Sequence, residues 1–297
     1  MGNITNQKYE TKTISNSPEL IVRHQSANSS PKGSIIFVHG ICHGAWCFEK
    51  FMDFFSENGY ECFALNLRGH GDNNPKGLTF ATLSQYVSDV KKCVEYCIDY
   101  CSKNEIKEKP FLLGHSMGGA VVQKYIGEYT NTVKGAILFA SATAGGMNFW
   151  ETIKDGFTHK NLLLANFVGL GFGKRMKIDS IWKSAFFDKR ISHEKAKIYK
   201  EKLCRESIII LFRDLYKEYT NNNDICIPIL VVGSYADSYF KEDSLITTAD
   251  AYKCSKNDTK KKLEILSDLC HDMMLDEVDE GWKKSAKAVL DFMENNK

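Results

Sequence analysis

The stretch FLLGHSMGG, residues 111–119, decides the fold. Its first three residues predict a short buried strand, and residues 118–129 predict a helix that begins directly after it. Gly114, Ser116 and Gly118 form the motif G-x-S-x-G at this junction, where a sharp turn holds the serine hydroxyl clear of the sheet. A serine that only caps a helix is the alternative. Strand, motif and helix in this order favour a nucleophile instead.

The regions on either side of this motif alternate short apolar runs with amphipathic helical stretches. This alternation is typical of a mainly parallel sheet covered by helices on both faces, an α/β fold. Strands are expected at 34–39, 60–67, 111–113, 135–140, 227–232 and 263–266. Helices are expected at 46–56, 82–98, 118–129 and 278–295. Thr82 and Gln85 form a capping box that would open the second of these helices.

An insertion interrupts the sheet pattern. From 146 to 220 the strand signals disappear and helical segments rich in aromatic residues replace them. We therefore expect one discontinuous core, residues 1–145 and 221–297, with a helical cap at 146–220. The aromatic residues of the cap are candidates for an apolar substrate pocket, although a small cap also needs such residues for its own packing. The candidates are Phe149, Trp150 and Trp182.

The charge of the chain is nearly balanced, but the cap is basic. The whole chain carries 39 Lys and Arg against 37 Asp and Glu, so it has no broad attraction for nucleic acid. Residues 148–220 carry 15 basic against 9 acidic side chains. This excess is compatible with transient contact with an anionic membrane surface or with an anionic substrate, and equally with solvated helix faces.

The cysteines and the N-terminus bear on the cellular compartment. The ten cysteines include no pair of C-x-x-C halves that would build a zinc site, and we expect them all to be reduced. The first twenty residues lack the apolar centre of a secretory signal, and no run approaches about 18 apolar residues. Asn6 stands where a myristoylation motif at Gly2 needs Ser or Thr. A cytoplasmic protein without a transmembrane segment is expected.

A serine nucleophile needs a general base, and the order along the chain narrows the choice among eight histidines. In this topology the base and its acid follow the nucleophile, on loops that leave later strands. His271 comes just after the last expected strand, 263–266, and is the preferred base. His159 and His193 lie in the insertion and are the alternatives.

The acid that orients the base should follow the strand expected at 227–232. Asp237 lies five residues beyond that strand, and Asp243 is the nearest competitor. We expect Asp237 to hold one tautomer of His271 and stabilise its imidazolium, so that the other ring nitrogen accepts the Ser116 proton.

Acyl transfer also needs donors for the negative oxygen that develops in the transition state. The backbone N–H after the nucleophile and another after an early strand supply them in this topology. Met117 and Ile41 occupy these positions. His43 and Trp46, which follow Ile41 closely, are candidates to line the mouth of the pocket.

Four motifs together resemble the α/β-hydrolase fold family over nearly the whole chain. They are HGICHGAWC (39–47), LRGHGD (67–72), LLGHSMGG (112–119) and CHDMMLD (270–276). HGICHGAWC is similar to a segment of plant-type methylesterases and hydroxynitrile lyases, whereas LRGHGD is more similar to general esterases and lysophospholipases. Two departures exist: Asn66 stands where the family often has Asp, and the interval between Asp237 and His271 is slightly long.

The resemblance implies a Ser-His-Asp hydrolase that acts on carboxylic esters, with a hydrophobic acyl or aromatic ester as the expected substrate and neither cofactor nor metal. The epoxide hydrolases and haloalkane dehalogenases of this fold have Asp at the strand-to-helix turn where this chain has Ser116. Two alternatives remain: a ligand sensor that keeps the pocket without turnover, and a lyase that uses the same three residues for acid–base chemistry.

Overall fold

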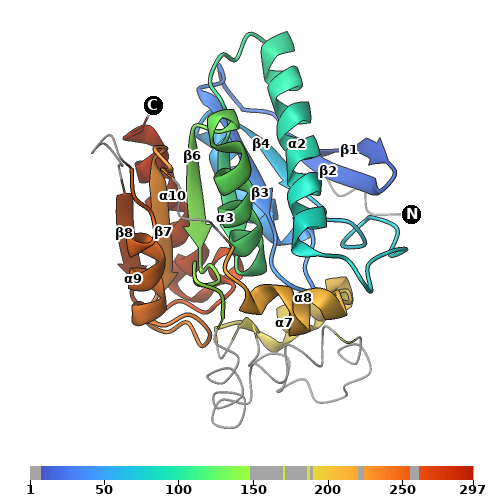
Figure 1. Ribbon diagram of the computed structural model, residues 1–297. Coiled ribbons are helices and arrows are strands. Elements are labelled where there is room, and N and C mark those ends of the chain that lie inside the picture. Colours follow the sequence, from blue (N-terminus) through green and yellow to red (C-terminus); the bar gives the residue numbers. More distant parts are fainter. Residues whose placement is uncertain are drawn as a thin grey trace.

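An eight-stranded sheet forms the centre of the computed structural model, which describes residues 8–147, 170, 186–187, 190–219, 224–254 and 261–296 (Figure 1). The strands are β1 Glu10–Asn16, β2 Glu19–Gln25, β3 Gly33–Val38, β4 Tyr60–Leu65, β5 Phe111–His115, β6 Gly135–Phe139, β7 Ile229–Ser234 and β8 Lys261–Leu266. Their order is β1-β2-β4-β3-β5-β6-β7-β8. In this sheet order, every neighbouring pair from β4 to β8 is parallel. At the other end of the sheet, β1 pairs antiparallel with β2, and β2 pairs antiparallel with β4. The predicted mainly parallel sheet is confirmed.

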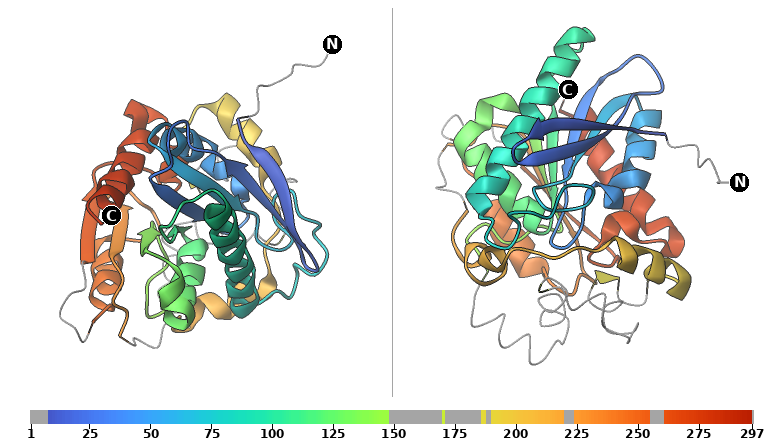
Figure 2. Two further views of the ribbon diagram at one scale, coloured as in Figure 1. Left: turned by 90° about the horizontal axis from the view of Figure 1, so that it is seen from above. Right: turned by 90° about the vertical axis from the view of Figure 1, so that its right-hand side faces the viewer.

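Helices cover both faces of the sheet (Figure 2). The helices are α1 Glu49–Glu57, α2 Leu83–Lys103, α3 Met117–Tyr129, α7 His193–Lys202, α8 Ile208–Phe212, α9 Glu242–Asp250 and α10 Gly281–Glu294. Successive side chains of a strand point to opposite faces. Ile35 and Phe37 of β3 therefore pack in one core cluster with α1 and α10, whereas Ile36 and Val38 pack in the other with α2 and α3. Burial on both faces explains why the central strands are continuous apolar runs.

Sequence reasoning located the central elements but missed two others. The Thr82 hydroxyl accepts a hydrogen bond from the Gln85 backbone N–H at 3.3 Å, so the expected capping box does open α2. The β1–β2 hairpin was not expected, because β1 is largely exposed and lacks a clear apolar alternation. Helix α9 was also missed; only two of its side chains are buried.

The parallel strands direct their carboxyl ends to one edge of the sheet, where the functional residues are expected. The loops that follow β3, β5, β7 and β8 all open there, and α7 and α8 lie across this edge at the bottom of Figure 1. These two helices belong to the predicted cap, whose limits at 146 and 220 stay a prediction. Six residues named from the sequence lie outside the described part of the chain. They are Gly2, Asn6, Phe149, Trp150, His159 and Trp182.

The expectation of ten reduced cysteines is wrong for one pair. Cys226 and Cys254 form a disulfide with their Cα atoms 5.0 Å apart. They are 28 residues apart in sequence, and the packing of α9 beside β7 brings them together, which no local spacing motif could signal. Disulfides are rare in a reducing cytoplasm. The expectation of reduced cysteines therefore no longer supports a cytoplasmic location, which stays a prediction. The cysteines of α2, by contrast, are free and buried in the core.

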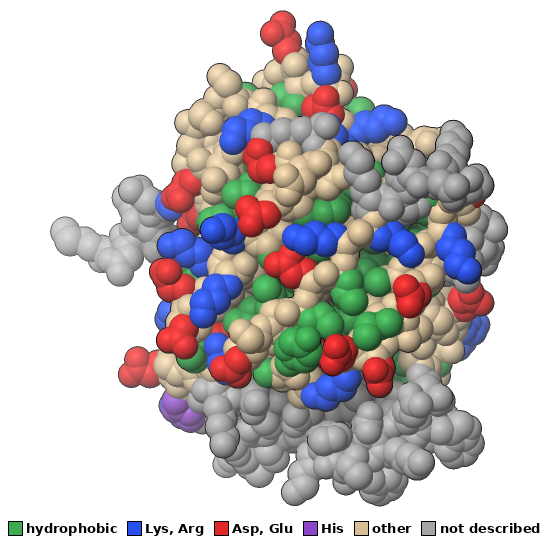
Figure 3. Space-filling view, turned by 90° about the vertical axis from the view of Figure 1, so that its left-hand side faces the viewer, with side chains coloured by type: hydrophobic (Ala, Val, Ile, Leu, Met, Phe, Trp, Pro, Cys, Tyr) green, Lys and Arg blue, Asp and Glu red, His purple; other side chains and the backbone are tan. Residues whose placement is uncertain are grey.

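The exterior carries mixed charge. At the β8 edge, basic and acidic side chains alternate around a group of hydrophobic ones (Figure 3). At about 0.1 M salt, the electrostatic potential of such neighbouring opposite charges is largely screened beyond about 10 Å. None of the helices that the structure describes is long and apolar enough to cross a membrane.

Candidate active site

Ser116 occupies a strained turn between β5 and α3. Its backbone has φ 54° and ψ −118°, a conformation that costs a non-glycine residue about 1–3 kcal/mol and persists only where the surroundings enforce it. Here the Ser116 N–H donates to the Phe139 carbonyl at 3.1 Å, and its own carbonyl accepts from Gly119 and Ala142. Three backbone hydrogen bonds to β6, its following loop and α3 therefore hold the turn.

Close packing requires glycine at positions 114 and 118, on either side of Ser116. A Cβ on Gly118 would lie 2.3 Å from the Val38 carbonyl oxygen, and a Cβ on Gly114 would lie 2.3 Å from the Gly118 carbonyl oxygen. The first turn of α3 thus rests directly on the end of β3. This contact sets the height of the Ser116 hydroxyl above the sheet edge.

Ser116, His271 and Asp237 form one hydrogen-bonded chain. His271 Nε2 lies 3.0 Å from Ser116 Oγ, and His271 Nδ1 lies 3.0 and 3.2 Å from the two carboxylate oxygens of Asp237. A carboxylate accepts, so Nδ1 carries the proton and Nε2 is free to accept one from the serine. The three residues chosen from the sequence are therefore brought together, despite the long interval between the acid and the base.

The competing acid and bases are elsewhere. Asp243 is exposed in the first turn of α9, and His193 is exposed at the start of α7. His159 lies outside the described residues. Asp237, by contrast, is fully buried, and its Oδ1 accepts hydrogen bonds from the backbone N–H groups of Tyr239 and Phe240 at 2.7 and 3.2 Å. These bonds aim its carboxylate at His271.

The electrostatics favour a proton on His271 when the serine releases one. Burial by itself lowers the pKa of His271, but the Asp237 carboxylate outweighs it, with a further contribution from Asp272, so the pKa is raised above its ordinary value. Both carboxylates would therefore stabilise an imidazolium at this position.

Ile41 and Met117 line the pocket together with Ser116. Among the described residues, neither backbone N–H makes a hydrogen bond, so both are available to a substrate oxygen. Gly40 brings the Ile41 loop close, because a Cβ there would lie only 3.0 Å from Ser116 Cβ. The Asn66 side chain supports the far end of this loop by accepting from the Ala45 N–H at 2.7 Å. The departure from Asp at this position therefore leaves a working acceptor.

A second cluster of buried polar side chains adjoins His271. Asp272 is fully buried, and its Oδ2 lies 3.0 Å from His43 Nε2, while its Oδ1 lies 3.5 Å from His115 Nε2. His115 also donates from Nε2 to the His271 carbonyl at 3.2 Å. Sequence reasoning missed Asp272 and gave His115 no role. The available signal was that Asp272 directly follows the proposed base.

A third buried cluster joins the segment before α8, part of the predicted cap, to the sheet region. Glu206, which precedes α8, lies 3.0 Å from His70 Nε2 through one oxygen and accepts from the Tyr86 hydroxyl at 2.7 Å through the other. The Cys42 N–H also points to Glu206, at 3.4 Å. The Cys204 N–H donates to the Cys42 carbonyl at 2.9 Å. The segment 204–207 therefore helps to hold the loop that carries Ile41.

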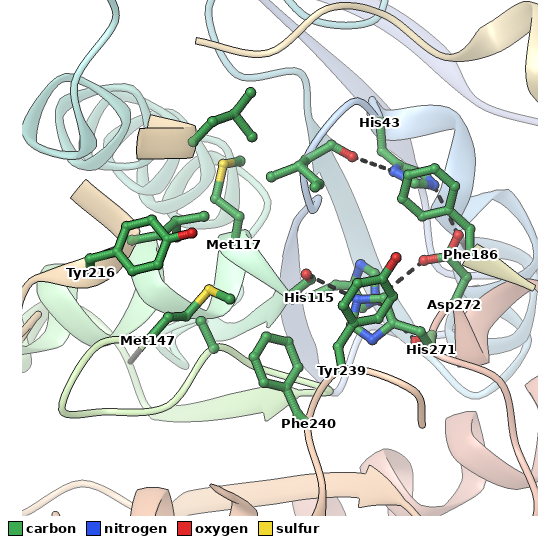
Figure 4. A pocket seen from close by; sticks show the side chains of 15 residues that line it. His43, His115, Met117, Met147, Phe186, Tyr216, Tyr239, Phe240, His271 and Asp272 are labelled. Atoms are coloured by element: carbon green, nitrogen blue, oxygen red, sulfur yellow. Dashed lines mark hydrogen bonds and ion pairs between the residues drawn. The ribbon is translucent and has the colours of Figure 1, made fainter. Parts of the chain in front are cut away.

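The pocket has an apolar side and a polar side. Figure 4 shows Met117, Met147 and Tyr216 on one side of the site and His43 with Asp272 on the other. Trp46, expected at the pocket mouth, is not among the lining residues. Its ring stacks behind His43 at 5.1 Å between centroids and is 4% exposed, because the turn 45–48 directs it into the core.

Two groups of side chains in the described residues have the composition of metal ligands. His115, His271 and Asp272 offer atoms within 4.8 Å of one another, but hydrogen bonds to Ser116 and Asp237 already engage both ring nitrogens of His271. In the other group, Cys226 and Cys254 form the disulfide, so their sulfur atoms are not thiolates. The first group fits acid–base chemistry better than metal binding.

Comparison with known families gives a match over most of the chain. The family described as serine aminopeptidase, S33, matches residues 29–278.

Curated relatives match over shorter stretches. A putative chloroplastic methylesterase 11 of Arabidopsis thaliana is 30% identical over 138 residues, which cover 44% of this chain and 34% of the relative. Methyl jasmonate esterase 1 of Vitis vinifera is 30% identical over 114 residues, covering 38% and 41%. The chain thus spans about a third to two fifths of the length of these relatives.

Likeness to solved structures extends over the whole chain. A soluble variant of monoglyceride lipase from Saccharomyces cerevisiae, solved with a substrate analogue, has a TM-score of 0.72 and 16% sequence identity. The alignment covers 99% of this chain and 98% of the lipase. At this level of identity the likeness shows the fold.

Proposed function

The chain belongs to the serine aminopeptidase family and has the α/β-hydrolase fold, and on this basis we propose that it is a serine hydrolase that cleaves carboxylic esters through an acyl-enzyme on Ser116. The observation that carries the proposal is the hydrogen-bonded chain of Ser116, His271 and Asp237, of which Ser116 and His271 line the pocket. The names of the relatives, methylesterase and methyl jasmonate esterase, support an ester over a peptide as the substrate.

The proposed reaction has two halves. Ser116 Oγ attacks the ester carbonyl while His271 Nε2 takes its proton, and the N–H groups of Ile41 and Met117 stabilise the oxyanion. The C–O bond to the alcohol then breaks, and His271 returns its proton to the leaving alkoxide. Water attacks the acyl-enzyme by the same route and releases the acid and free Ser116. Asp237 stays ionised throughout and holds the imidazole in place.

The lining of the pocket supports an uncharged, largely apolar substrate. Apolar side chains, among them Leu211, Leu215 and Phe240, predominate in the lining, and Met117 and Met147 lie on the side away from Asp272 (Figure 4). No Lys or Arg lines the pocket within the described part of the chain, so no permanently charged cation there would neutralise a substrate carboxylate. We infer that the acyl group, or an aromatic group of similar size, occupies this side.

The test is intact-mass analysis after reaction with a fluorophosphonate, together with turnover of p-nitrophenyl esters of short and long acyl chains. We expect one adduct on the wild type and none on Ser116→Ala. Ser102→Ala, which changes an exposed serine of α2, is the matched control and should behave as the wild type. The wild type and control should hydrolyse the esters, with a preference that reports the size of the apolar side.

Each other outcome points away from the proposal. An adduct without turnover of any ester would favour a ligand sensor or a lyase over an esterase. Absence of an adduct on folded wild-type protein would show that Ser116 is not an activated nucleophile.

A further inference from the structure

The buried pair of His43 and Asp272 links two loops of the site that are far apart in sequence. His43 lies on the loop after β3, which carries Ile41, whereas Asp272 directly follows His271 on the loop after β8. His43 Nδ1 lies 2.6 Å from the Ile41 carbonyl oxygen, and His43 Nε2 lies 3.0 Å from Asp272 Oδ2 (Figure 4). His43 thus bridges the proposed oxyanion loop and the loop of the base.

The hydrogen-bond partners define where the protons are. A carbonyl oxygen only accepts, so His43 Nδ1 carries a proton and donates it to Ile41. A second proton must then lie between Nε2 and the carboxyl group of Asp272. Burial by itself raises the pKa of Asp272, but His43 outweighs this effect and the pKa is lowered, so Asp272 is a carboxylate that accepts from His43 Nε2. Such charge-assisted hydrogen bonds are about twice as strong as neutral ones.

The oxyanion loop needs this support. Cys42 follows Ile41 with a φ of 63°, which is unfavourable for a residue with a side chain and persists only where neighbours enforce it. The His43 bond holds the carbonyl of Ile41 at the start of this strained turn. Without that bond the turn could relax and rotate the Ile41 N–H away from the pocket.

We propose that His43 and Asp272 are positioning residues that fix the Ile41 N–H relative to His271, so that the oxyanion donor and the base are held as one unit. This inference rests on the proposed esterase function. His115 belongs to the same support, since its Nε2 donates to the His271 carbonyl and lies 3.5 Å from Asp272 Oδ1.

The carboxylate of Asp272 has an electrostatic consequence that a purely structural residue would lack. An oxygen of Asp272 lies within 4.8 Å of a His271 ring nitrogen. The groups that face His271 are Asp237 and Tyr239 from the loop after β7, His115 and Ser116 from β5 and its turn, and Asp272 from its own loop. Burial keeps His115 neutral by lowering its pKa to about 3, so Asp237 and Asp272 are the negative charges in this set.

The experiment measures kcat and KM for a p-nitrophenyl ester, and the rate of fluorophosphonate labelling, in two variants. The double variant His43→Ala/Asp272→Ala removes both partners of the hydrogen bond together and leaves no buried carboxylate without a partner. We expect kcat and the labelling rate to fall about 10- to 100-fold, with KM changed by less than about 3-fold. The displaced Ile41 N–H would stabilise the oxyanion of the transition state less well but would leave binding of the unreacted ester little changed.

Asp272→Asn keeps a hydrogen-bonding group but no charge. It should retain kcat within about 5-fold of the wild-type value at high pH. Loss of the negative charge should lower the pKa of His271, so the fall of kcat/KM at acidic pH (the acid limb of the pH–rate profile) should move to lower pH.

The matched control is another buried imidazole–carboxylate pair. His24 and Glu61 lie 2.8 Å apart on β2 and β4, outside the pocket lining. The variant His24→Ala/Glu61→Ala should lose thermal stability as the test variant does and yet keep its kcat.

The outcomes separate this inference from the proposed function. A folded His43→Ala/Asp272→Ala protein with unchanged kcat, or with only a raised KM, would overturn the positioning role. An unmoved acid limb in Asp272→Asn would overturn the electrostatic part. If the wild type shows neither labelling nor turnover, the proposed function itself fails.

Discussion

The Ser116 turn shows how much of this site depends on single residues. Its positive φ is stable only because three backbone hydrogen bonds hold it and because Gly118 allows α3 to rest on β3. Asp237 is similarly held, by two backbone N–H groups that leave its carboxylate aimed at His271. At this scale the proposed chemistry depends on the proton positions on one imidazole.

We expect Asp237→Asn to lower kcat by about 10,000-fold, because an amide that donates to Nδ1 would leave the proton of His271 on Nε2, where it cannot accept from Ser116. Circular dichroism should show an unchanged fold. Asp243→Asn alters the exposed competitor on α9 and should keep full activity. Comparable losses in the two variants would contradict the assignment of Asp237.

The pH dependence follows from the same imidazole. His271 must be neutral to accept the serine proton, so kcat/KM should fall as pH decreases through its pKa. Because the pKa is raised from 6.5, the midpoint of this acid limb should lie above pH 6.5. A pH–rate profile from pH 5 to 9 measures it. A midpoint well below 6.5 would mean that Asp237 and Asp272 do not act on the base as proposed.

At the scale of elements, a buried ion pair links the predicted cap to the sheet region. Glu206 reaches from the segment before α8 to His70, in the loop after β4, and to Tyr86 on α2. Burial lowers the pKa of His70, but Glu206 raises it above its ordinary value; burial raises the pKa of Glu206, but His70 lowers it below its ordinary value. The two residues are therefore charged together over a wide pH range.

We expect Glu206→Gln to lower the free energy of unfolding by about 3 kcal/mol, because the variant breaks a buried pair by removing one partner. The Glu206 contribution is complete above pH 4.5 and is lost as pH falls through its lowered pKa. The His70 contribution is complete below pH 6.5 and is lost as pH rises through its raised pKa. The deficit should thus be largest between pH 4.5 and 6.5.

Urea unfolding at pH 5.5 and pH 8.5 measures this deficit. Glu201→Gln, which changes an exposed residue of α7, is the control and should differ little from the wild type at either pH. An equal deficit for Glu206→Gln at both pH values would contradict the pairing with a charged His70.

At the scale of the whole molecule, the sheet gathers loops from distant parts of the chain at one edge and leaves the opposite edge for stabilisation. The carboxyl ends of β3, β5, β7 and β8 lead to the residues of the site. The disulfide of Cys226 and Cys254 lies at the other end of β7, where the chain enters the strand. Stability and activity should therefore respond differently to a reductant.

We expect reduction to lower the free energy of unfolding by about 3 kcal/mol, since the bond closes a loop of 28 residues in the unfolded chain. The melting temperature should fall by several degrees with a phosphine reductant, and ester turnover at 25 °C should persist. In Cys226→Ser/Cys254→Ser the reductant should change nothing. An effect of equal size in that variant would trace the loss to another cause.

Local patterns were sufficient for much of this architecture. The apolar runs of β3 to β7, the capping box of α2 and the G-x-S-x-G turn all depend on residues within a few positions of one another, so the sequence predicted them. The edge elements β1 and α9 were missed because solvent covers much of them and weakens the apolar period. His271 and Asp237 were chosen by their order relative to strands, which is also a local property.

Other features depended on the tertiary structure alone. His43 and Asp272 are 229 positions apart, and His70 and Glu206 are 136 apart. Trp46 faces the core behind His43, and Cys226 pairs with Cys254, neither of which a spacing motif signals. The sequence by itself determined the central elements, the nucleophile turn and the order of the proposed catalytic residues, because hydrophobic period and turn chemistry are short-range. Only the tertiary structure decided which buried charges meet, because burial is stable only when a distant partner offsets the lost hydration.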